Sequence, residues 1–188
     1  MKRTATVALM LNLGVAGVYA QQQSVSMTFS GTAAASTLNL LQPDTNNSED
    51  NSAGDGTLGP FTFRNVRAIR ASPQQSSTCA GPTQIYFSSA AGAGVFRFQD
   101  GSLLKVNLME AGDCIDFAAG QARCTMTFQI TGGTGRFKDA SGTLTLTETV
   151  LPVLADATNN PVFFAATGEF AGTISGVAAE GERSGERR

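Results

Sequence analysis

The sequence predicts an all-β fold, either a barrel or a sandwich. Hydrophobic residues alternate with a period of two in most segments, which is typical of antiparallel strands with one buried face. After the first twenty residues no stretch has helical periodicity. Turn residues recur at short, regular intervals, as at Asp100-Gly101 and Asn159-Asn160-Pro161, which favours a barrel or sandwich of many strands.

The first twenty residues read as a secretory signal peptide. Lys2 and Arg3 precede an apolar run over about 5–18, and a small-residue pattern ends at Ala20. The run is too short to span a bilayer comfortably, and no second run follows it. We expect cleavage before Gln21, which leaves 188 − 20 = 168 residues as one soluble domain, secreted or periplasmic, without a membrane anchor.

Strands are expected wherever the alternation is clear. Cys124, Met126, Phe128 and Ile130, for example, share one face of a strand, with Thr125, Thr127 and Gln129 opposite. The expected strands are 24–33, 58–70, 83–89, 94–100, 102–110, 122–131, 142–151 and 162–176.

The barrel is expected to occupy residues 21–179. Two segments lack the alternation, one inside this region and one after it. Residues 42–56 are polar, acidic and free of large apolar side chains, so we expect a mobile loop there. Residues 180–188 carry alternating charges and are expected to form a disordered tail.

Composition excludes several function classes. Removal of the leader takes two of the 13 basic residues and none of the 15 acidic ones, so the remaining charge is 11 − 15 = −4. Binding to nucleic acid or to an anionic membrane is therefore disfavoured. The absence of histidine excludes Ser-His-Asp and Cys-His catalysis and histidine-based zinc sites. We expect neither a metal nor a cofactor.

Three cysteines in an exported chain allow one internal disulfide and leave one thiol. Cys114 and Cys124 flank what reads as one hairpin connection, and we favour that pair. Cys79 then remains free, although a bond from Cys79 to either of the others would close a longer loop and stabilise the fold more.

The glycine cluster Gly132, Gly133 and Gly135 is interpreted as a tight turn. A dinucleotide-binding loop needs G-x-G-x-x-G before a helix, but Lys138 stands at the third glycine and a strand follows. The glycines are expected to supply positive φ angles in a connection between two strands.

The stretch ITGGTGRF followed by ASGTLTLT resembles the corresponding hairpin of the allene oxide cyclase and dirigent superfamily. GVFRFQDGSLLKVNL is similar to the strands that precede it there, so the resemblance covers about 94–150. It implies an eight-stranded antiparallel barrel whose central cavity accommodates hydrophobic small molecules. Dirigent sequences carry arginine where this chain has Ser141, and the catalytic residues of the plant cyclases have no match here.

Alternation also assigns a face to three charged residues. Arg67, Glu148 and Glu110 each fall on the same face as apolar residues of their own strands. If that face is the interior, Arg67 could anchor an anionic or carbonyl group of a ligand, with Glu148 or Glu110 as base or hydrogen-bond acceptor. The alternative is an ion pair at the mouth of the barrel, or a β-bulge that turns these side chains to water.

Three functions follow from these observations. The leading hypothesis is an exported barrel that binds a hydrophobic or amphipathic small molecule. The second is a cyclase- or dirigent-type enzyme that confines a reactive intermediate, and the third is a structural or cell-surface protein with a filled barrel. The sequence leaves both catalysis and homo-oligomerisation open.

Overall fold

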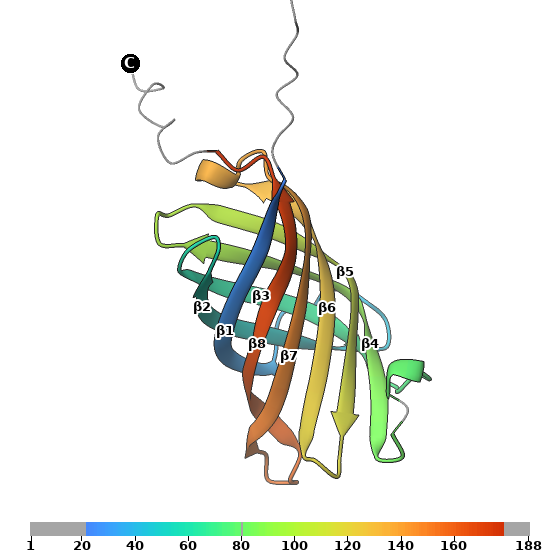
Figure 1. Cartoon of the computed structure of the whole chain (residues 1–188). Helices are drawn as coiled ribbons and strands as arrows, with labels where there is room; N and C mark the ends of the chain where they lie inside the picture. Colours follow the sequence, from blue (N-terminus) through green and yellow to red (C-terminus); the bar gives the residue numbers. More distant parts are fainter. Residues whose placement is uncertain (1–21, 80, 179–188) are drawn as a thin grey trace, which may run out of the picture.

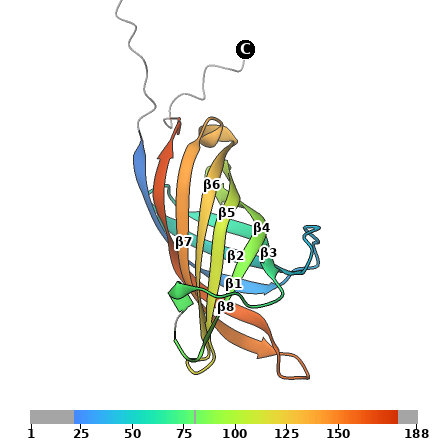
Figure 2. The same cartoon turned by 90° about the vertical axis from the view of Figure 1, so that its right-hand side faces the viewer.

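The structure is a computed structural model that describes residues 22–79 and 81–178. Eight antiparallel strands each pair with the next along the chain, and β8 pairs with β1 to close a barrel (Figures 1 and 2). The predicted all-β fold with an eight-stranded antiparallel barrel is therefore confirmed. The expected leader and the charged tail lie outside the described residues, and no helix within the described ranges is long and apolar enough to cross a membrane.

Two short helices accompany the strands. The elements in chain order are β1 (Gln23–Ala35), β2 (Thr45–Gly56), β3 (Phe61–Arg70), η1 (Ser77–Cys79), β4 (Gln84–Phe98), β5 (Leu103–Asp116), β6 (Gln121–Gly133), η2 (Gly135–Phe137), β7 (Ser141–Ala155) and β8 (Pro161–Ser175). Helix η2 lies at the end of the barrel drawn at the top of Figure 1, and the β7–β8 hairpin lies at the opposite end. We call these the η2 end and the β7–β8 end.

Our expectation of a loop over 42–56 is wrong for most of that segment, because Thr45–Gly56 form strand β2. Small residues face the interior here because their neighbours are large. Gly56 pairs with Met27, and Gly54 lies between Phe29 and Phe61. A Cβ at Gly54 would collide with the Phe61 ring. A strand can therefore lack large apolar residues and still form part of the barrel, because side chains of the adjacent strands fill the core next to it.

Six of the other predicted strands correspond to observed strands, with shifted boundaries. The predicted strands 83–89 and 94–100 are one continuous strand, β4, which runs through the small residues between them. The number of strands was therefore predicted correctly although one strand was missed and another was divided.

The glycine cluster lies between β6 and β7. Gly132 and Gly135 have φ angles of 89° and 60°, which L side chains rarely adopt. Gly133 packs so closely on Leu103 that a Cβ there would overlap the Leu103 carbonyl oxygen. The chain then forms η2 and enters β7 at Ser141.

Phenylalanine rings fill the half of the barrel nearest the η2 end. Phe63 and Phe96 lie 4.3 Å apart between ring centroids, and Phe170 lies 4.9 Å from Phe96 and 5.1 Å from Phe63. These rings are almost fully buried and mostly meet at tilted or edge-on angles, the geometry that aromatic pairs prefer. The barrel therefore has a packed core in this half.

Helix η2 closes that end of the barrel. Phe137 is fully buried and its ring lies 4.7 Å from that of Phe98. The guanidinium of Arg136 lies over both rings, donates a hydrogen bond to the carbonyl of Leu58 and pairs with Asp100. The side chain of Leu58 is itself buried.

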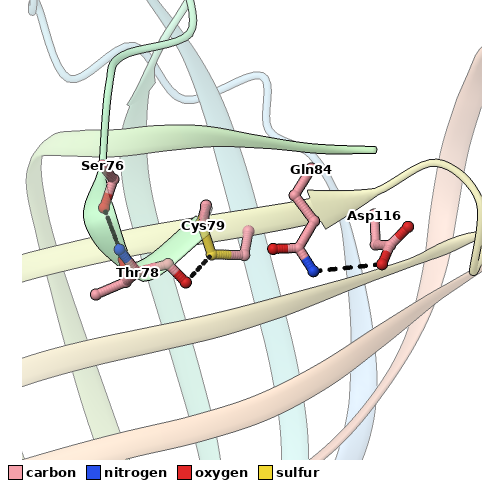
Figure 3. Close-up of a disulfide and its surroundings, with 6 residues drawn as sticks. Ser76, Thr78, Cys79, Gln84 and Asp116 are labelled. Carbon is pink, nitrogen blue, oxygen red and sulfur yellow. Dashed lines mark hydrogen bonds between the residues drawn. A yellow bond between two sulfur atoms is a disulfide. The ribbon is translucent and has the colours of Figure 1, made fainter. Parts of the chain in front are cut away.

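The disulfide joins Cys79 to Cys114, and the predicted pair Cys114–Cys124 is wrong (Figure 3). In the β5–β6 ladder Cys114 lies opposite Arg123, and Cys124 lies opposite Asp113. Because side chains alternate between the two faces of a sheet, Cys114 points outward while Cys124 points into the barrel as a buried free thiol. A disulfide also agrees with an extracytoplasmic protein.

Candidate functional site

A cluster of ionisable side chains lies inside the barrel next to the phenylalanine core. Three of these residues form a row across neighbouring strands. Asp113 of β5 lies opposite Cys124 of β6, and Cys124 lies opposite Glu148 of β7. Arg67 of β3 and Asp50 of β2 reach the same space from other strands. All five side chains are buried. We call these five residues the ionic cluster.

Arg67 is neutralised by two carboxylates. Its Nη1 donates hydrogen bonds to both oxygens of Asp113 at 2.6 and 2.8 Å, and its Nε lies 3.6 Å from Asp50 Oδ2. The last distance fits an ion pair but is too long for a hydrogen bond. Burial opposes the charge of Arg67, but Asp113 and Asp50 outweigh that effect and raise the pKa of the guanidinium well above its usual value.

Burial disfavours the ionised form of Glu148. Burial, followed by the negative charge of Asp50, raises its pKa from 4.5 to about 8, and Arg67 offsets only part of this. Its Oε1 has no hydrogen-bond partner among the described residues. Near neutral pH Glu148 is therefore a neutral carboxyl group, able to donate one hydrogen bond and to accept another.

Asp50 is held by β3. Asn65 lies opposite Asp50 in the ladder and donates a hydrogen bond of 2.9 Å to its Oδ2. Burial raises the pKa of Asp50, partly offset by Arg67 and Asn65. The other oxygen of Asp50 and the Asn65 side-chain carbonyl have no partner among the described residues. Several polar atoms of the cluster thus keep unused hydrogen-bonding capacity inside the barrel.

Of the three residues singled out by alternation, Arg67 and Glu148 lie in the ionic cluster and Glu110 does not. Arg67 and Glu148 face the interior as expected, but Arg67 binds Asp113 and Asp50. Glu110 lies exposed on the outer surface, because the β5–β6 register shifts between Leu108 and Glu110 and reverses the faces beyond that point. A role for Glu110 inside the barrel is therefore excluded by its position.

An apolar pocket of about 290 Å³ lies at the β7–β8 end. Ile115, Ala122 and Val150 line it and occupy the same three strands as Asp113, Cys124 and Glu148, each two residues nearer to this end. Residues two apart in a strand share a face and lie about 7 Å apart.

Phe164 of β8 completes the apolar wall of this pocket. The pocket therefore adjoins the ionic cluster along three strands of the barrel wall. We call it the mouth pocket.

Among the described residues no three Asp, Glu or Cys side chains are arranged to hold a metal ion. Within the cluster, Arg67 offsets part of the carboxylate charge, and the raised pKa of Glu148 keeps that carboxyl protonated near neutral pH. No protein-family model matches the chain, and no curated protein matches it either.

Sequence reasoning missed Asp50, Asn65 and Asp113. Asp50 lies in the strand that was read as a loop. Asn65 lies between Phe63 and Arg67 in the alternation of β3, so its inward position could have been read from the sequence. Asp113 alternates with the inward residues Ala111 and Ile115, but the bulge before Ala111 breaks the pattern that leads to it.

Proposed function

We propose that the protein is a secreted or periplasmic barrel that binds a hydrophobic or amphipathic small molecule at the β7–β8 end. The apolar part of the ligand occupies the mouth pocket and its polar group is directed toward Glu148. The observation that carries this proposal is the register that places Ile115, Ala122 and Val150 directly beside Asp113, Cys124 and Glu148. Pockets for small ligands combine apolar walls with a few polar groups in this way.

The charge of the cluster favours a neutral or cationic polar group. Three carboxyl groups surround one guanidinium, and Arg67 already binds Asp113 and Asp50. An anionic group would meet carboxylates without a free cation, which is costly in a buried site. This proposal differs from the hypothesis that Arg67 anchors an anionic or carbonyl group of a ligand. A hydroxyl or amine group of the ligand would instead meet the unpartnered oxygen of Glu148.

The resemblance to the allene oxide cyclase and dirigent superfamily agrees with this proposal at the level of the fold. The disulfide supports export, because such bonds persist in oxidising compartments. A structural protein with a filled barrel is the second candidate. The phenylalanine packing of the half nearest the η2 end favours it.

Octanol, octylammonium and octanoate test the proposal, because they share one chain and differ in charge. Isothermal titration at neutral pH is expected to show binding of octanol and octylammonium and at least about tenfold weaker binding of octanoate. Ala122→Leu fills the mouth pocket and should abolish binding, whereas Thr149→Leu places the same side chain on the outer face of β7 and should not. Equal binding of all three probes would contradict the charge argument. If none of them binds, or if Ala122→Leu has no effect, the filled structural barrel is the better explanation.

A further inference from the structure

A second pocket lies on the outer surface of the barrel and has a different chemistry. It has a volume of about 520 Å³ and covers the outward faces of β4, β5 and β6. The lining residues are Thr78, Gln84, Tyr86, Glu110, Gly112, Cys114, Asp116, Gln121, Arg123, Thr125 and Thr127. We call it the outer groove. The barrel wall separates it from the ionic cluster, because neighbouring residues of a strand face opposite sides.

One wall of the outer groove is fixed covalently. The disulfide from Cys79 to Cys114 holds η1 against β5, and Figure 3 shows this bond beside the hydrogen bond from Gln84 to Asp116. Residues before η1 are fastened to β4, since the Gln74 backbone N–H donates to the Tyr86 carbonyl at 2.9 Å. The wall is thus held in place without a ligand, which reduces the ordering cost of binding.

An aromatic ring forms the floor. Tyr86 lies opposite Cys114 in the ladder, but its ring leans over Gly112, where a Cβ would overlap the ring atoms. Glycine at 112 therefore allows the ring to lie against the backbone of β5. Thr125 faces Gly112 from β6, so a hydroxyl group borders the ring on that side.

Two opposite charges flank the ring without neutralising each other. Glu110 lies on β5 two residues before Gly112, and Arg123 lies opposite Cys114 on β6. Within the described part of the chain neither side chain forms an ion pair or a side-chain hydrogen bond, and the Tyr86 hydroxyl forms none. These donors and acceptors remain available to a ligand. Asp116 also lines the groove, but its carboxylate already accepts hydrogen bonds from Thr83, Gln84 and the backbone of Ala118 and Ala119.

This lining excludes several ligand classes. Strands β5 and β6 are paired on both sides, and the edge of β4 that extends beyond its pairing with β3 is bridged by Gln74 at Tyr86 and Ser88, which leaves little free strand edge for a peptide. One guanidinium beside two carboxylates, Glu110 and Asp116, does not favour phosphate groups. A purely apolar ligand would desolvate charged groups without replacing their hydrogen bonds. The class that matches is neutral, rich in hydroxyl groups and flat enough to stack on a ring.

We propose that the outer groove binds a neutral oligosaccharide, with one sugar ring stacked on Tyr86 and its hydroxyl groups bonded to Glu110 and Arg123. The carboxylate accepts hydrogen bonds from adjacent hydroxyl groups and the guanidinium donates them. The volume of about 520 Å³ lies within the range of small-ligand sites and exceeds that of the mouth pocket. The inference does not depend on the function proposed for the interior.

Tyr86 provides a direct spectroscopic readout. The chain has two tyrosines and no tryptophan, and the other tyrosine is Tyr19 of the expected leader. Tyrosine emission of protein that starts at Gln21 therefore reports on Tyr86 alone. Burial, followed by the charge of Glu110, already raises the pKa of Tyr86. A sugar stacked on the ring should change its emission and raise that pKa further, because it removes more water.

The experiment is a screen of neutral and acidic glycans on an array, followed by fluorescence and calorimetric titration with the best neutral oligosaccharide. Tyr86→Ala, Glu110→Gln and Arg123→Gln should each weaken binding at least about tenfold, whereas Thr143→Ala on the outer face of β7 should not. Glu110 and Arg123 are exposed, so those two variants are expected to fold normally.

Ala122→Leu, which fills the mouth pocket, should leave glycan binding unchanged and so separates the two sites. Absence of any neutral glycan from the bound set would overturn the proposal. So would binding that survives Tyr86→Ala, or binding that fails to alter tyrosine emission.

Discussion

Replacement of Glu148 by glutamine should remove a decline in stability that the native protein shows as pH rises. The folded barrel raises the pKa of Glu148 from 4.5 to about 8. Between these values the folded protein keeps a proton that the unfolded chain releases, so stability falls with increasing pH until the folded group also ionises. Glutamine resembles the neutral carboxyl at every pH and lacks this decline.

The magnitude follows from the shift. Neutral pH lies about 2.5 units above the ordinary pKa of the carboxyl, and each unit corresponds to about 1.4 kcal/mol. The variant should therefore be more stable than the native protein by about 3 kcal/mol at pH 7, and equally stable near pH 4. Asp50 also has a raised pKa, but it is present in both proteins and largely cancels in the difference.

Urea unfolding followed by circular dichroism, from about pH 4 to about pH 8, measures that difference. Glu169→Gln is the matched control, since Glu169 is an exposed carboxylate on the adjacent strand β8. Its curve should run parallel to that of the native protein. Parallel curves for Glu148→Gln as well would show that Glu148 ionises normally in the folded state, and the account of the ionic cluster would be wrong.

Three further predictions concern the interior. Arg67→Met should destabilise the protein by about 3–5 kcal/mol at neutral pH, because Asp113 loses its cation. Adding Asp113→Asn to this variant should recover much of the lost stability. If urea unfolding shows that the two losses simply add, the pairing is contradicted. A thiol reagent should find no reactive group in the native protein and one, Cys124, after unfolding without reductant, whereas three thiols would refute the disulfide. Phe63→Ala should lower the free energy of unfolding by about 3–5 kcal/mol, and Val95→Ala, at a more exposed position, should lower it by less than about 1 kcal/mol. Equal losses for the two variants would contradict the packed aromatic core.

Alternation predicted the fold well where inward side chains are large. Met126 and Phe128 mark the buried face of β6 so clearly that its position needs little else. Strand β2 carries Asp50, Ser52 and Gly54 on its inward face, so nothing in its own sequence indicates burial. The information lies in the bulky residues of β1 and β3, which become neighbours of β2 only after the barrel has formed.

The site was less predictable because it depends on register. Alternation placed Arg67 and Glu148 inside, but it could not indicate that Arg67 pairs with Asp113 rather than with Glu148. That pairing depends on the shift before Glu110, which reverses the two faces of β5. The bulge breaks the alternation of β5 between Leu108 and Ala111, but the sequence of β5 alone does not give the register beyond the break.

The opposite directions of Cys114 and Cys124 also act as a selection step during oxidative folding. In the unfolded chain the two cysteines are 124 − 114 = 10 residues apart and would meet more often than either meets Cys79. A bond between them would force two side chains from opposite faces of the β5–β6 ladder onto one side, so it is incompatible with barrel closure. Thiol exchange can therefore correct early errors until the strands close. From then on Cys124 is enclosed and the bond to Cys79 can no longer be exchanged by an internal thiol.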